Sequence, residues 1–179
     1  MSGRAVTLVV CGAPLAARTP DIVAAMRRAD WTVVVVGTPS AVPWLDADAI
    51  AGLTGSPVRF DFRTPDRPKS VEPSAVVVCP ATFNSVNKAA IGAADTFALS
   101  VMCEAIGAGI PVVAVPMVNR KLWGHPAWPA GLDTLRRAGV VLVDIADGRD
   151  GTSPVESGTG AAVAVRFDPA WVVARLPER

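Results

Sequence analysis

The segment that decides the fold is residues 31–37, WTVVVVG, in which no polar residue follows Thr32. Strands with one face in water alternate polar and apolar residues, whereas a strand without alternation is covered on both faces. Strands of the second kind belong to parallel sheets flanked by helices. Residues 31–37 therefore predict one strand of a parallel α/β sheet.

Short apolar runs of the same kind recur along the chain, with helical stretches between them. Strands and helices that alternate in this way predict right-handed crossovers and helices on both faces of the sheet. We expect about six strands, at residues 5–11, 31–37, 57–60, 75–79, 111–115 and 140–143. Because we find neither a repeat nor a linker, we predict a single domain over residues 1–179, with a mobile, turn-rich loop at residues 146–160.

The composition argues against several classes of protein. The chain has 179 residues, of which 51% are apolar and 18% are charged, and its formal net charge is +1. A chain this apolar can bury enough surface to fold, and the balanced charge argues against a nucleic-acid partner held by electrostatics. The charged fraction is below the ~25% typical of soluble domains, and a buried subunit interface is the simplest explanation for it.

Nothing in the sequence predicts contact with a membrane, because no segment reaches the ~20 uninterrupted apolar residues of a spanning helix. Residues 5–11 are apolar, but Gly-Ala-Pro follows at once, which indicates a first strand and a turn rather than a signal peptide. The three cysteines, Cys11, Cys79 and Cys103, cannot all pair with one another. We therefore expect buried, reduced thiols in a cytoplasmic protein.

The loops that follow the strands are the expected ligand-binding segments, because a parallel sheet binds ligands outside the carboxyl ends of its strands. Gly12 would let the backbone approach a phosphate, although its loop lacks the GxGxxG pattern and a plain tight turn explains it equally well. Thr38 and Ser40 place two hydroxyls after a buried strand, which suits phosphate oxygens or a helix cap.

Residues 80–85 (PATFNS) and 116–123 (PMVNRKLW) are the most informative of these loops. Taken alone, Asn84 or Ser85 would be the N-cap of a following helix, and the second segment a packed surface loop. Together they resemble two motifs of the flavoprotein family of homo-oligomeric flavin-containing cysteine decarboxylases, Pro-Ala-Ser-Ala-Asn-Thr and Pro-x-Met-Asn-x-x-Met-Trp. That family includes phosphopantothenoylcysteine decarboxylases and the peptidyl-cysteine decarboxylases of lanthipeptide and linaridin biosynthesis.

This resemblance implies a flavodoxin-like (Rossmann-like) parallel sheet and FMN as the cofactor. The residues that it implies for the FMN phosphate are Gly12, Ala13, Pro14, Thr38 and Ser40. Those that it implies for the flavin are Thr82, Phe83, Asn84, Ser85 and Met117. Asn119 would hold the carboxylate of the substrate, because an amide donates hydrogen bonds without adding a second buried charge. We predict no metal site.

Departures from the family pattern concern catalysis. Asp66 stands where the family has its catalytic histidine, and it would be either a base or a solvated loop residue. The one histidine of the sequence, His125, would be a substitute acid–base group or would hold its loop by a hydrogen bond to a backbone carbonyl. Val118 and Leu122 replace two motif methionines, and the Ala-Cys-Gly segment of the phosphopantothenoylcysteine decarboxylases has no counterpart near residues 147–156.

The function that the resemblance implies is oxidative decarboxylation of a cysteine carboxylate. In the family, oxidation of the cysteine gives a thioaldehyde-like species that loses carbon dioxide and leaves an enethiol. Because the Ala-Cys-Gly segment is missing, we expect the substrate to be the C-terminal cysteine of a peptide. The alternatives are a flavin-binding regulatory or assembly subunit without the family histidine, and a phosphopantothenoylcysteine decarboxylase with a small-molecule substrate. The resemblance also implies a homotrimer or a dodecamer.

Overall fold

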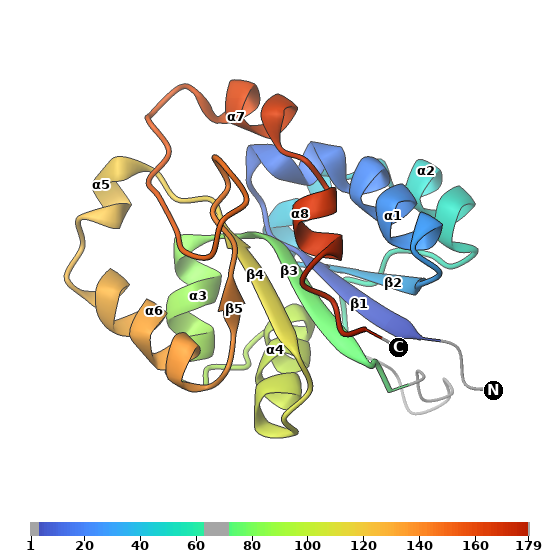
Figure 1. Ribbon diagram of the computed structural model, residues 1–179, viewed down its shortest axis with the longest axis horizontal. Helices are drawn as coiled ribbons and strands as arrows, with labels where there is room; N and C mark the ends of the chain where they lie inside the picture. Colours follow the sequence, from blue (N-terminus) through green and yellow to red (C-terminus); the bar gives the residue numbers. More distant parts are fainter. Residues whose placement is uncertain (1–3, 63–71, 179) are drawn as a thin grey trace.

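A five-stranded, fully parallel sheet forms the centre of the protein, as the computed structural model shows (Figure 1). The structure describes residues 4–62 and 72–178. The strand order is β2-β1-β3-β4-β5, and the strands are β1 (Ala5–Val10), β2 (Thr32–Gly37), β3 (Ala75–Ala81), β4 (Val112–Pro116) and β5 (Val141–Leu142). The predicted flavodoxin-like class is confirmed, since this is the doubly wound order 2-1-3-4-5.

The sheet has five strands rather than about six, because residues 57–60 form no strand in the described chain. Their contact with the sheet is a single bridge between Arg59 and Val36. The Arg59 amide donates to the Val35 carbonyl at 3.0 Å, and the Gly37 amide donates to the Arg59 carbonyl at 2.8 Å. Pro57 has no N–H to extend this ladder on the N-terminal side of Arg59.

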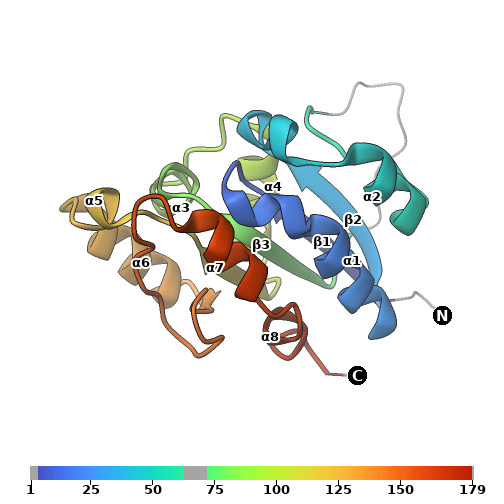
Figure 2. The same ribbon diagram turned by 90° about the horizontal axis from the view of Figure 1, so that it is seen from above.

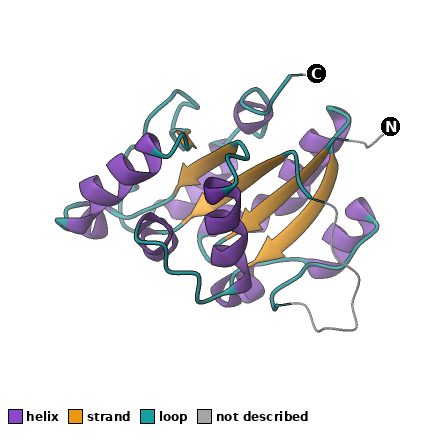
Figure 3. Cartoon of the chain, turned by 90° about the horizontal axis from the view of Figure 1, so that it is seen from below, coloured by secondary structure: helices purple, strands orange, loops and turns teal. Residues whose placement is uncertain are grey.

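Helices connect the strands and cover both faces of the sheet (Figures 2 and 3). The α-helices are α1 (Thr19–Arg28), α2 (Ala47–Thr54), α3 (Phe83–Ala90), α4 (Phe97–Gly107), α5 (Arg120–Trp123), α6 (Ala127–Arg137), α7 (Gly160–Arg166) and α8 (Ala170–Val173). Two 3-10 helices, η1 (Pro14–Arg18) and η2 (Pro39–Trp44), follow β1 and β2. None of the helices in the described ranges is long and apolar enough to cross a bilayer.

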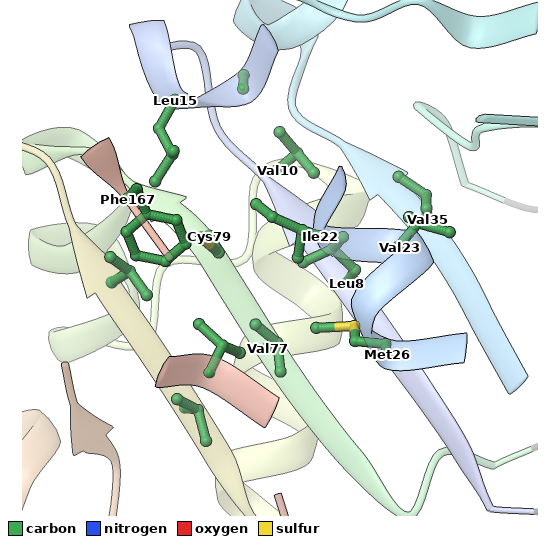
Figure 4. Close-up of a cluster of buried hydrophobic side chains, with 14 of the residues drawn as sticks. Leu8, Val10, Leu15, Ile22, Val23, Met26, Val35, Val77, Cys79 and Phe167 are labelled. Carbon is green, nitrogen blue, oxygen red and sulfur yellow. The ribbon is translucent and has the colours of Figure 1, made fainter. Parts of the chain in front are cut away.

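Alternate side chains of β1 enter two separate cores. Leu8 belongs to a cluster with Ile22 and Met26 of α1, and this cluster extends to Phe167 near the C-terminus (Figure 4). Val9, the next residue, belongs to the opposite cluster, which contains residues of α3, α4 and α6. Period-two alternation places successive side chains on opposite faces of a strand, so an apolar strand such as β1 is buried on both of them.

The ends of β1 and β2 meet at Gly12. A Cβ atom added at Gly12 would lie 2.3 Å from the backbone oxygen of Ser40, which is too close for non-bonded carbon and oxygen atoms. The Thr38 amide also donates to the Val10 carbonyl at 2.9 Å, which holds the two strand-end loops together. Glycine is therefore required at position 12 by the close approach of a neighbouring backbone.

We expect Gly12→Ala to lower the free energy of unfolding by about 1–3 kcal/mol, because the added methyl must displace the loop at Ser40. The matched control is Gly52→Ala in α2, where an added Cβ meets nothing within 4 Å. That change should raise the stability by about 0.5–1 kcal/mol, since alanine favours a helix interior. Urea denaturation of the cofactor-free protein measures both, and equal effects at the two glycines would contradict the close approach.

Candidate functional site

A cavity of about 640 Å³ opens at the carboxyl end of the sheet. The loops that follow β1, β3 and β4 form most of its wall. The strand order reverses between β1 and β3, and parallel sheets bind ligands beside such a reversal. Its volume lies within the roughly 300–1,000 Å³ typical of small-molecule sites. This cavity is the candidate functional site.

Eight of the residues predicted from the sequence line this cavity: Gly12, Ala13, Pro14, Thr82, Phe83, Asn84, Met117 and Asn119. Thr38, Ser40, Ser85 and His125 are placed next to it rather than in its wall, and each contacts a neighbouring loop or a lining residue. Asp66 lies outside the described residues. The structure brings the loop at Gly12 and the two motif loops together, and the roles of their individual residues stay predictions.

Thr82 connects the cavity to a buried thiol through a row of hydroxyls. Its Oγ1 accepts a hydrogen bond from the Ser85 amide at 3.4 Å, which makes Thr82 the N-cap of α3. The Ser85 Oγ lies 3.1 Å from Thr82 Oγ1 and accepts from the Cys11 Sγ at 3.2 Å. Burial raises the pKa of the Cys11 thiol, so the thiol keeps its proton and acts as the donor. If Ser85 then donates to Thr82, the Thr82 hydroxyl hydrogen is left for a group in the cavity.

Asn119 is held by a second helix cap. Its Oδ1 accepts from the Leu122 amide at 3.0 Å, and this bond begins the short helix α5. Because a backbone amide can only donate, the oxygen of the side chain is assigned to the cap and the Nδ2 group is left with two hydrogens to donate. Asn119 also lines the cavity, so the cap orients an amide donor there.

Aromatic side chains support the wall at Phe83. Its ring stacks on Trp128 at a centroid distance of 5.6 Å, and the ring of His125 meets it edge-on at 5.6 Å. The Nδ1 atom of His125 accepts from the Ala127 amide at 3.1 Å, close to the start of α6. In the described chain His125 therefore supports the Phe83 ring and holds its own loop. It holds the loop by accepting from a backbone amide, whereas the sequence predicted a hydrogen bond to a backbone carbonyl.

Residues 155–161 form a wall that the sequence did not predict. The Val155 amide donates to the Val118 carbonyl at 2.8 Å, and the Arg120 amide donates to the Val155 carbonyl at 3.1 Å. These bonds pair Val155 with Asn119 as a parallel bridge, and they place the following residues, Glu156 among them, along the cavity. The sequence shows a run of turn residues here, and the mobility predicted for residues 146–160 remains a prediction.

Other lining residues were also missed or underrated. Trp44 lies at the end of η2 and reaches the cavity from the loop after β2. Val118 and Leu122, which replace motif methionines, also line the cavity. Gly160 allows α7 to approach, since an added Cβ there would lie 2.8 Å from the Pro14 Cγ. A single glycine or tryptophan in a loop carries no pattern that identifies it beforehand.

Comparison with curated proteins finds relatives named for coenzyme A biosynthesis. The chain is 31% identical over 156 residues to the coenzyme A biosynthesis bifunctional protein CoaBC of Mycobacterium bovis. That match covers 84% of this chain and 36% of the relative. The chain thus spans about a third of the length of the curated relatives it matches.

Among solved structures, the fold is similar to FMN proteins. The FMN-dependent cysteine decarboxylase TvaF from thioviridamide biosynthesis is 25% identical, with a TM-score of 0.70 over 79% of this chain and 90% of that one. The FMN binding protein AtHal3 has a TM-score of 0.74 over 97% and 96% of the two chains, and its 19% identity supports the fold alone.

The sequence profile of the Flavoprotein family matches residues 1–166, which include every described strand and the whole wall of the cavity. The family expected from the two loop motifs is thereby confirmed. This chain belongs to the Flavoprotein family.

Proposed function

We propose that this protein binds FMN in the cavity and catalyses the oxidative decarboxylation of a cysteine carboxylate. The observation that carries the proposal is Asn119, whose oxygen is engaged in a helix cap while its amide hydrogens are available at the cavity wall. An amide held in this way can grip a carboxylate without placing a second full charge there. FMN, when bound, supplies the acceptor for the two electrons that the cysteine loses.

The residues of the cavity fit a flavin with a phosphate. Phe83, Met117 and Trp44 offer apolar wall to an aromatic ring system, and Thr82 offers a hydroxyl group. Thr38 Oγ1 and Ser40 Oγ lie 3.0 Å apart beside Gly12, where phosphate oxygens would find hydroxyl donors. Gly160 fits the same picture, because a side chain there would meet Pro14 and Met117, which both line the cavity.

The chain's own residues orient the substrate and keep its carboxylate in place. In the overall reaction the cysteine loses carbon dioxide, two electrons and two protons, and a carbon–carbon double bond forms beside the sulfur. Asn119 would hold the carboxylate until the bond to the α-carbon breaks. The apolar side chains of Val118 and Leu122 would exclude water from the same wall.

The C-terminal cysteine of a peptide is the substrate that we propose first. The similarity to TvaF, a cysteine decarboxylase from thioviridamide biosynthesis, supports it, as does the absence of an Ala-Cys-Gly segment from the sequence. Phosphopantothenoylcysteine is the second candidate, which the similarity to proteins of coenzyme A biosynthesis favours. Both substrates present the same carboxylate and thiol.

We also propose that the protein works as a homo-oligomer, either a trimer or a dodecamer built from trimers. Large apolar side chains are exposed on the single chain, among them Ile91 at 81% and Val165 at 72%. Such side chains on a monomer would favour association. Light scattering on the purified sample gives the mass, and a monodisperse monomer would contradict this part of the proposal.

The main experiment combines a visible spectrum with a product assay. The purified protein should be yellow, or should become so when FMN is added. Incubated with a peptide that ends in cysteine, it should lower the peptide's mass by one carbon dioxide and two hydrogen atoms, while a peptide that ends in serine stays unchanged. Phosphopantothenoylcysteine is assayed in parallel to separate the two substrates.

A protein that stays colourless with added FMN would overturn the proposal. A yellow protein that leaves both cysteine substrates unchanged would support the regulatory or assembly subunit instead.

We expect Asn119→Asp to slow decarboxylation strongly while FMN binding and folding are retained. The aspartate oxygen can still accept from the Leu122 amide, so α5 keeps its cap. The donor group, however, becomes an anionic oxygen that repels the substrate carboxylate, and we expect kcat/KM to fall by about 100-fold. Thermal unfolding and the flavin spectrum are the controls. Full activity in this variant would exclude Asn119 as the carboxylate-binding group.

We expect His125→Asn to keep decarboxylation within about twofold of the wild type, because an asparagine oxygen can replace Nδ1 as the acceptor of the Ala127 amide. His125→Ala should lose that cap and about 1 kcal/mol of stability. Initial rates and urea denaturation of both variants make the test. A large rate loss in the asparagine variant would show instead that His125 carries a proton.

A further inference from the structure

The charge of the cavity wall conflicts with the charge of the proposed ligands. Among the described residues that line the cavity, Glu156 is the one with an ionisable side chain. A carboxylate in the wall opposes both an FMN phosphate and a substrate carboxylate, since like charges at close range are unfavourable. A positive group beside Glu156 would therefore favour the entry of an anion.

Arg120 is that group in the structure. Its guanidinium Nε and Nη2 both contact the same oxygen of Glu156, so the two side chains form an ion pair at the rim of the cavity. The backbone supports this pairing, because the Arg120 amide donates to the carbonyl of Val155, the residue before Glu156. The bridge between Asn119 and Val155 sets the register in which these two charges meet.

The position of Arg120 in the chain also matters. It directly follows Asn119, the proposed carboxylate-binding residue, and is the first residue of α5. Both members of the ion pair are largely exposed, with side-chain exposures of 65% for Arg120 and 56% for Glu156. An exposed ion pair is worth little, so another carboxylate can replace one partner at low cost. Arginine is suited to this exchange, since its planar fork can bind a carboxylate through two hydrogen bonds.

We propose that Arg120 determines the specificity of the site for a substrate with a free carboxylate, and that Glu156 is an internal competitor for it. In the free protein Glu156 is paired with the guanidinium of Arg120. A substrate carboxylate held by Asn119 takes its place and Glu156 turns to solvent, so a carboxylate gains a contact that an amide or ester cannot replace. This inference rests on the proposed function, because it concerns the carboxylate that Asn119 is proposed to bind.

The test measures binding rather than turnover. The probes are a short peptide that ends in serine with a free carboxylate and the same peptide as its C-terminal amide, since neither carries a thiol to be oxidised. Titration calorimetry with the FMN-loaded protein gives the Kd of each probe. The wild type should prefer the carboxylate. Arg120→Gln should weaken carboxylate binding by about threefold and Glu156→Gln should strengthen it by about threefold, with the amide affected by neither.

The matched controls are Lys121→Gln and Arg136→Gln. Lys121 is the next cation in the same helix α5, and Arg136 forms an exposed ion pair with Asp133 in α6, which contributes no residue to the cavity wall. Both variants should bind the carboxylate probe as the wild type does. If Lys121→Gln weakened it as much as Arg120→Gln, a diffuse positive field would explain the data and Arg120 would have no direct contact.

Two further results would overturn the inference. One is equal affinity of the wild type for the carboxylate and the amide. The other is weaker carboxylate binding in Glu156→Gln, which would make Glu156 a ligand for a positive group of the substrate. A failure of the proposed function looks different, because the sample would then be colourless with added FMN. Titration of the cofactor-free protein with the same two probes then still reports on Arg120.

Discussion

The burial of β1 on both of its faces is the constraint on which the rest of the structure depends. A strand covered on both sides carries few polar side chains, Thr7 being the one in β1, so the polar chemistry of this fold is concentrated at the strand ends. Leu8 and Val9 point into two different cores, and the first residue free to approach a ligand is Gly12. The same reasoning applies to β3 and β4, whose carboxyl ends supply Thr82 and Asn119 to the same cavity. The site is thus a consequence of how the sheet is covered.

Helix caps set the orientation of the two most important polar side chains. Thr82 caps α3 and Asn119 caps α5, and in each case the oxygen that accepts from a helix amide is fixed in direction. A cap ordinarily serves stability alone. Here each capping residue also lines the cavity, so the cap fixes the position of a polar side chain in the cavity wall. The residues that begin these two helices thus also form part of the site.

The parts of the fold that could be predicted from the sequence were those that give a local sequence pattern. The apolar runs predicted four strands and the edge strand β5, and the loop after β1 together with the two motif loops predicted eight residues of the cavity wall. The strand predicted at residues 57–60 was wrong, because a segment that forms a single bridge, here at Arg59, has the same sequence pattern as a segment that forms a longer pairing. The wall at residues 155–161 was missed for a related reason. Its position depends on the hydrogen bonds of Val155 with Val118 and Arg120. Val118 lies 37 residues before Val155, and no local pattern encodes such a pairing.

Trp44 at the cavity wall has a consequence for observing this protein in solution. The sequence contains five tryptophans and no tyrosine, so its near-ultraviolet emission comes from indole alone. Trp31 and Trp128 are buried in the two cores, whereas Trp44 is exposed beside the place where an aromatic ligand would lie. The molecule therefore carries an intrinsic optical reporter at its own binding site, sensitive to occupancy while the buried indoles report on the integrity of the fold.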